Sequence, residues 1–320
     1  MKKINLICSR ADITTLHAEW IVPIFEQYFN YIYIEDTDIK TLSKKDSIFL
    51  TQNTYFKDNI LMVHDWYNEW YQQGYKVLEA EFHERYVDEQ PLINNNRLNI
   101  CNQNWFWYLE SLQFRHLGHL DYIRNPNVQK CFFMPMRLRR THRDQIFKKF
   151  QPLLSESLHS YGDMGIHLLE DLDYQHPAYQ RYLNPKWYDT TCFSVVVESA
   201  ISDRLFISEK IFKPLAYYHP LVVWGSPGSL THLQDIGFET FGHAIDESYD
   251  TITSPFNRLN AIFSIVNDLT QQFIQGKNIF EDNITKQKVQ HNHDRFFDKS
   301  LIKSNIKNEI INPILEFVES

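Results

Sequence analysis

The stretch CFSVVVESAISDRLFISEKIFKPLAYYHPLVVWGSPGSL, residues 192–230, decides the fold class. Its apolar run Phe193–Val197 ends at a glutamate, and a polar loop then leads to a helical pattern over Glu209–Tyr218. A second apolar run, Leu221–Trp224, follows and ends in Gly-Ser-Pro-Gly. Apolar strands that are joined through a helix predict a parallel sheet of the α/β class.

The same alternation of strands and helices extends toward the N-terminus. Strands are predicted at Ile4–Cys8, Tyr31–Glu35, Ser47–Leu50, Lys76–Leu78 and Cys131–Met134, and amphipathic helices at Thr14–Phe29 and Phe56–Gln73. A polar segment near residue 125 contains Asn-Pro, which breaks helices. A chain of 320 residues also fits two domains of about 150 residues better than one. We therefore predict one α/β domain over residues 1–125, a second over 126–290 and a helical tail over 291–320.

The composition excludes several classes of protein. Hydrophobic residues make up 43% of the chain and aromatic residues 15%, which excludes a disordered chain. The net charge of −8 argues against a general nucleic-acid binder, because such a protein needs a basic surface. The chain has only 9 glycines and contains neither a P-loop motif nor the glycine pattern of dinucleotide-binding enzymes.

The sequence also predicts a compartment. No stretch approaches the roughly 20 apolar residues of a transmembrane segment, and the apolar run after the first residues is short for a signal peptide. The four cysteines are far apart in the sequence, a spacing typical of reduced thiols. We expect a soluble, cytoplasmic protein without a transmembrane segment.

The candidate binding residues follow the strands of the 192–230 stretch. Ligands of open parallel sheets bind beyond the carboxyl ends of the strands, where Glu198, the Glu209-Lys210 pair and the Gly225–Gly228 turn are expected. Ser208 can cap the following helix, whose N-terminus favours an anion. Because a helix N-terminus disfavours a cation, Lys210 indicates an anionic partner.

A run of arginines follows the predicted strand Cys131–Met134. Residues 137–143 read RLRRTHR and contain no acidic residue. Arginine binds phosphate oxygens in a bidentate manner. We predict that Arg137 or Arg139 contacts an anionic ligand.

Three segments together resemble a known family. VVVES (195–199), FISEKIF (206–212) and PLVVWGSPGSL (220–230) look like the donor-binding core of the α-1,3/1,4-fucosyltransferases. The resemblance is close over residues 192–241. The family usually has Phe-Glu-Asn where this chain has Val-Glu-Ser at 197–199, and often Tyr at the position of Phe206.

This resemblance implies a fold and an activity. The family has the GT-B architecture, in which two Rossmann-like domains face a cleft, and C-terminal helices complete the fold. Its members are inverting glycosyltransferases that use GDP-fucose. The resemblance thus implies transfer of a sugar, fucose first, from a nucleotide-sugar donor to a saccharide acceptor, with no metal and no cofactor beyond the nucleotide sugar.

The resemblance also implies roles for individual residues. Glu209 would bind ribose or sugar hydroxyls, and Lys210 would meet the pyrophosphate. The segment KVLEAEFHE (76–84) would supply the catalytic base, Glu81 first and Glu79 second. The expected donor-binding residues are Arg137, Arg139, Glu198, Phe206, Ser208, Glu209, Lys210, Gly225 and Ser226.

Two alternatives remain open from the sequence. Asp171-Leu172-Asp173 has the D-x-D form of metal-dependent GT-A glycosyltransferases. The chain could instead be a non-catalytic protein that binds a nucleotide sugar or a glycan. In that case neither Glu79 nor Glu81 would act as a base.

Overall fold

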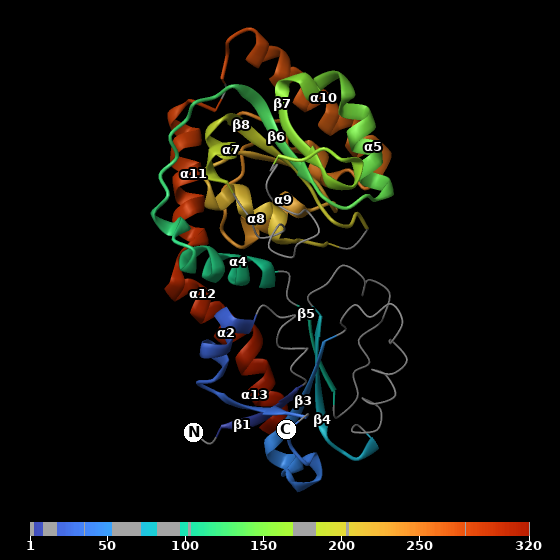
Figure 1. The fold of residues 1–320 in the computed structure, drawn as a ribbon, viewed down its shortest axis with the longest axis vertical. Helices are drawn as coiled ribbons and strands as arrows, with labels where there is room; N and C mark the ends of the chain where they lie inside the picture. Colours follow the sequence, from blue (N-terminus) through green and yellow to red (C-terminus); the bar gives the residue numbers. More distant parts are fainter. Residues whose placement is uncertain are drawn as a thin grey trace. The chain divides into compact units, whose positions relative to one another are not determined.

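The chain divides into two compact units in the computed structural model (Figure 1). The structure describes residues 3–8, 18–34, 36–52, 72–81, 97–101, 104–168, 184–202, 205–278 and 280–319. Unit 1 consists of Met1–Gln113 and Asp298–Ser320, and unit 2 is Phe114–Phe297. Each unit contains a sheet of parallel strands with helices, so the prediction of an α/β chain with two parallel sheets is confirmed.

Unit 1 contains a five-stranded sheet in the order β2-β1-β3-β4-β5. Its strands are β1 Ile4–Cys8, β2 Phe29–Tyr33, β3 Ser47–Gln52, β4 Lys76–Glu81 and β5 Arg97–Cys101, and its helices include α2 Ala18–Phe25 and α4 Trp105–His116, which crosses the unit boundary. Ile7, Phe49 and Val77, on the three central strands, are almost fully buried. The predicted helix over Phe56–Gln73 lies almost entirely outside the described residues.

The C-terminal helices belong to unit 1. They are α12 Lys299–Ile306, a π-helical turn over Lys307–Ile311 and α13 Asn312–Glu319. Pro313 has no N–H for the carbonyl four residues earlier, and the helix widens to its π-helical turn directly before it. The Lys76 ammonium, on β4, donates to the carbonyls of Phe317 (2.6 Å) and Val318 (3.1 Å). The end of α13 is therefore bound to the sheet.

Unit 2 contains a four-stranded sheet in the order β7-β6-β8-β9. Its strands are β6 Lys130–Met136, β7 Ser157–Tyr161, β8 Thr191–Val197 and β9 Leu221–Trp224. Every residue of β8 is buried, as expected for an inner strand of a parallel sheet that is covered on both faces. Each fully buried valine of this strand contributes about 1.5–3 kcal/mol through removal of its side chain from water.

Helices cover both faces of the unit 2 sheet. They are α5 Thr141–Phe150, α7 Pro185–Asp189, α8 Glu209–Ala216, α9 Ser229–Asp235, α10 Pro255–Ile274 and α11 Asn283–Phe296. In Figure 1, α5 and α10 lie on one side of the sheet, while α8 and α11 lie together on the other. Among the residues that the structure describes, no helix combines the length and the apolar character that a membrane crossing requires.

The N-terminus of α9 is capped from a distant part of the chain. The Asp250 carboxylate accepts the backbone N–H of Leu230 (3.0 Å) and of Thr231 (3.1 Å), and also the Thr231 hydroxyl (3.1 Å). The carbonyl of Asp250 accepts the N–H of Gly228 (2.9 Å). A protein carboxylate thus occupies the end of this helix that would otherwise attract an anion.

Asp250→Ala should lower the free energy of unfolding by about 1–2 kcal/mol, because it leaves helix N–H groups and the Thr231 hydroxyl without their acceptor. Urea denaturation followed by circular dichroism measures the change. Asp235→Ala, at the exposed C-terminal end of α9, is the matched control and should be neutral or slightly stabilising. Equal stability of the Asp250 variant and the wild type would contradict the capping role.

Candidate functional site

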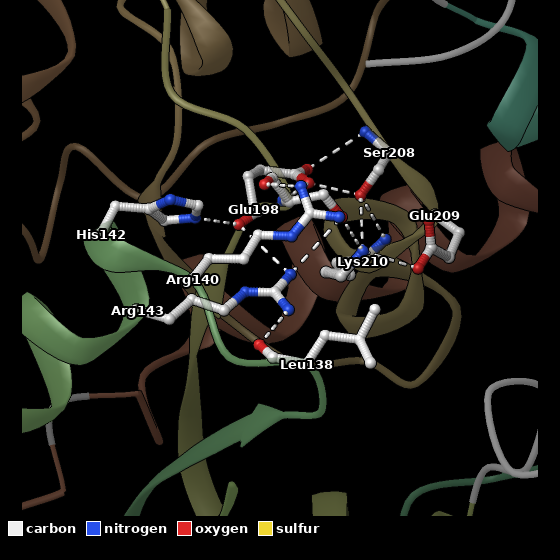
Figure 2. A network of polar contacts seen from close by, with 9 residues as sticks. Leu138, Arg140, His142, Arg143, Glu198, Ser208, Glu209 and Lys210 are labelled. Atoms are coloured by element: carbon white, nitrogen blue, oxygen red, sulfur yellow. Dashed lines mark hydrogen bonds and ion pairs between the residues drawn. The ribbon is translucent and has the colours of Figure 1, made fainter. Parts of the chain in front are cut away.

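A cluster of charged side chains lies where β6 and β8 end. The chain leaves β6 at Met136 and enters α5 at Thr141, and it leaves β8 at Val197 and enters α8 at Glu209. β6 and β8 are neighbours in the parallel sheet, so both connections emerge at the same edge. This edge is where open α/β sheets bind ligands. We call the residues gathered there, Arg140, His142, Arg143, Glu198, Ser199, Ser208, Glu209 and Lys210, the strand-end cluster (Figure 2).

The Glu198 carboxylate lies at the centre of the cluster and is fully buried. One oxygen accepts the backbone N–H of Ser208 (3.1 Å), and the other accepts the N–H of Ser199 (3.2 Å) and the Ser208 hydroxyl. Burial raises the pKa of this carboxyl, while the Lys210 charge and the Ser208 hydrogen bonds act in the opposite direction. The donors around it satisfy the oxygens of a carboxyl group that water does not reach.

Lys210 lies in the first turn of α8, two residues after the capping residue Ser208. The Ser208 side chain accepts the backbone N–H of Lys210, as an N-cap does. The Lys210 ammonium donates to the Ser199 hydroxyl (2.7 Å), the Ser208 hydroxyl (3.3 Å) and the Glu209 carboxylate (2.8 Å). Burial alone would raise the pKa of Glu209, but Lys210 and Lys213 lower it to about 2. Glu209 therefore remains ionised well into the acid range.

Two arginines from the start of α5 reach the same place. Arg140 donates to the carbonyl of Ser199 (2.6 Å). Arg143, which is 2% exposed, donates to the carbonyl of Leu138 (2.9 Å), to that of Glu198 (3.4 Å) and to the Ser199 hydroxyl (3.4 Å). Figure 2 shows both guanidinium groups directed toward Glu198 and Lys210. The cluster thus gathers three cations with two carboxylates in a chain of net charge −8.

The arginines that the sequence analysis favoured lie in the same loop. Arg139 has a largely exposed side chain that pairs with Asp144 (2.9 Å), and its backbone N–H donates to Asp163 (2.6 Å). Arg137 is partly buried, and its carbonyl accepts the N–H of Asp163 (3.0 Å). Sequence reasoning ranked Arg140 and Arg143 below these two. The helical spacing of Arg143 with the buried residues 146 and 150 could have shown that it faces inward.

The remaining candidates of unit 2 lie around the cluster. Phe206 is buried before the cap of α8. Gly225 directly follows β9, and a Cβ placed there would lie 3.1 Å from Cγ of Glu198. The Ser226 hydroxyl is buried and has no hydrogen-bond partner within the described part of the chain. Ser226 therefore retains an unused hydrogen-bonding group in the part of the chain that the structure describes.

The other candidates are only partly described. Glu79 and Glu81 lie in β4, opposite Asn99 and Cys101 of β5, at the carboxyl end of the unit 1 sheet. The backbone shows β4 extending past the predicted end at Leu78 to include both. Their role as base stays a prediction.

Asp171 and Asp173 lie outside the described residues. Within the described ranges, no group of three or more His, Cys, Asp or Glu side chains could hold a metal ion.

Comparisons with known proteins were made by sequence and by structure. No family model matches the sequence, and no curated protein matches it. Solved structures do match, among them a crystal structure of an α1,3-fucosyltransferase with GDP-fucose. The alignment covers 93% of this chain and 91% of that chain, at 9% sequence identity and a TM-score of 0.42.

The lowered pKa of Glu209 predicts a pH effect on stability. Its ionised form stabilises the fold at pH values above the ordinary pKa of 4.5, and this contribution is lost as the pH falls toward about 2. Glu209→Gln should therefore lose about 1–3 kcal/mol less stability than the wild type over this range. Melting temperatures between pH 5 and pH 2 measure the difference.

The matched control is Glu281→Gln, which removes an exposed carboxylate outside the cluster. It should retain the pH dependence of the wild type. If Glu209→Gln and the wild type lose stability in parallel as the pH falls, the Lys210–Glu209 pair does not have the strength described here.

Proposed function

We propose that this chain is a glycosyltransferase that binds the diphosphate of a nucleotide-sugar donor at the strand-end cluster. The observation that supports this most is the convergence of Arg140, Arg143 and Lys210 at the carboxyl ends of β6 and β8. A nucleoside diphosphate carries several negative charges within a few ångströms. Three fixed cations at a helix N-terminus are the kind of site that stabilises such a group.

The present partners of these cations suggest how an anion would bind. Arg140 and Arg143 donate to carbonyl oxygens and to the Ser199 hydroxyl. A phosphate oxygen carries negative charge, so it attracts a guanidinium more strongly than these neutral oxygens do, and a phosphate can accept two parallel N–H bonds from one arginine. In addition, the carboxylate of Asp250 already occupies the N-terminus of α9. The N-terminus of α8 is therefore the more favourable place for the phosphates.

The proposed reaction is inverting transfer of a sugar, with GDP-fucose as the donor that the sequence resemblance favours. A carboxylate, Glu81 or Glu79, takes the proton of an acceptor hydroxyl. The acceptor oxygen then forms a bond to the anomeric carbon as the bond between that carbon and the phosphate oxygen breaks. The bonding electrons leave with the nucleoside diphosphate, and the cluster's cations stabilise its developing charge. The acceptor is proposed to be a saccharide, and the two units to form a GT-B enzyme.

Removal of a single cation should weaken diphosphate binding. Lys210→Ala and Arg140→Ala should each reduce the affinity for GDP by about 10- to 150-fold, because each loses a charge-assisted contact of about 1.5–3 kcal/mol. Arg139→Ala, measured alongside, shows whether the exposed arginine also contributes. The affinity for guanosine should change little, because it carries no phosphate. Isothermal titration calorimetry in EDTA measures all of these values.

Lys186→Ala is the matched control. Lys186 is exposed on α7, directly before the amino end of β8, at the opposite edge of the sheet. The Lys186→Ala variant also loses one positive charge, and it should bind GDP as tightly as the wild type does. If the Lys210 and Arg140 variants also bind GDP as the wild type does, the diphosphate does not bind at the cluster.

The proposed base gives a separate prediction for turnover. Glu81→Gln, or else Glu79→Gln, should abolish sugar transfer and leave the affinity for GDP nearly unchanged, because a base acts on the acceptor. GDP release in the presence of an acceptor measures turnover, with EDTA present to exclude a metal-dependent route through Asp171 and Asp173. Unchanged turnover in both variants would show that the base lies elsewhere.

A further inference from the structure

The loop between β8 and α8 begins and ends on the same carboxylate. Glu198 is the first residue after β8, and it accepts the backbone N–H of the next residue, Ser199, together with the N–H and hydroxyl of Ser208, the last residue of the loop. These three hydrogen bonds join residues that are nine positions apart. The buried carboxylate therefore fixes the distance between the two ends of the loop.

Both serines that Glu198 fixes are also ligands of the Lys210 ammonium. The ammonium lies 2.7 Å from the Ser199 hydroxyl and 3.3 Å from the Ser208 hydroxyl. The Ser208 hydroxyl has one hydrogen, which it donates to Glu198. Its lone pairs are thereby left for the backbone N–H and the ammonium of Lys210. The direction of this hydrogen bond is set by the carboxylate.

The surroundings of Glu198 separate it from a direct role in binding. Its side chain is fully buried, and Gly225 leaves the space beside its Cγ that a side chain would otherwise fill. Its carboxylate oxygens already accept three hydrogen bonds from the protein. The sequence analysis included Glu198 among the residues that bind the donor, whereas these contacts favour an indirect role.

We propose that Glu198 is a positioning residue, which orients the Lys210 ammonium toward the donor diphosphate through Ser199 and Ser208. This proposal rests on the proposed function, because it assigns the lysine's target as a diphosphate. It goes further in naming how the lysine is held. Glu198 itself does not touch the donor.

A glutamine at position 198 cannot reproduce these contacts. It has one oxygen acceptor, and its amide nitrogen only donates. If the amide nitrogen takes the place of the oxygen that faces Ser199, it opposes that N–H and reverses the hydrogen bond of the Ser208 hydroxyl. If it takes the other place, it opposes the N–H of Ser208. In both orientations one of the two serines loses its position.

A double-mutant cycle on GDP affinity tests the proposal. Glu198→Gln should weaken GDP binding by about tenfold in the wild-type background, and by less than about twofold in the Lys210→Ala background, because the residue through which it acts is then absent. An equal loss in both backgrounds would overturn the positioning role. If Lys210→Ala itself leaves GDP binding unchanged, the proposed function fails, which is a different result.

A second measurement needs no ligand. Limited acetylation of the full chain with acetic anhydride, followed by mass spectrometry, compares Lys210 with the exposed Lys186 in the same sample. Glu198→Gln should raise the relative labelling of Lys210 several-fold, and Ser208→Ala, which removes only the hydroxyl link, should also raise it. Unchanged labelling of Lys210 in folded samples of either variant would contradict the proposal.

Discussion

The arrangement at the sheet edge of unit 2 depends on one buried carboxylate. Glu198 lies at the end of a strand whose residues are all buried, and its carboxyl oxygens must be satisfied without water. Donors from the two ends of the following loop, Ser199 and Ser208, supply the hydrogen bonds. The hydrogen bonds that satisfy Glu198 therefore also fix the start of α8 and the position of Lys210. The burial of Glu198 at the strand end thus determines where the Lys210 ammonium lies.

The two helices that follow β8 and β9 differ in how their N-termini are used. The first turn of α8 contains a lysine and faces arginines from α5, whereas the N-terminus of α9 is capped by the carboxylate of Asp250. Both helices follow strands at the same edge, and Arg140, Arg143 and Lys210 converge on the α8 side. This asymmetry favours one position for the phosphates of a ligand. It also explains how a chain of net charge −8 can offer an anion site.

Much of the sheet architecture could be predicted from the sequence. The continuous apolar runs over Phe193–Val197 and Leu221–Trp224 are found as strands, because parallel strands buried on both faces leave no polar alternation. β5 and β7 were missed. Their sequences, RLNIC and SLHSY, mix polar with apolar residues. In β7, hydrogen bonds such as that between Ser157 and His159 satisfy the polar groups, and this compensation is not visible in a sequence pattern.

The positions of site residues could be predicted where they depend on a single helix or strand. The cap at Ser208 and the position of Lys210 follow from a local pattern, and both lie where the sequence placed them. The choice among the arginines depends on contacts with distant residues, because Asp144 and Asp163 hold Arg139 while Ser199 attracts Arg140. Gly225 is among the expected donor-binding residues, and the structure shows the Glu198 side chain as its close neighbour.

The central claim is that the strand-end cluster binds a diphosphate with its own cations. The most direct measurement compares the affinities of the wild-type chain for GDP, GMP and guanosine by calorimetry in EDTA. The account predicts that affinity increases with each phosphate, with GDP bound more than about 100-fold more tightly than guanosine through at least two charge-assisted contacts. Equal affinities for GDP and guanosine, or GDP binding that appears only with Mn²⁺, would contradict it.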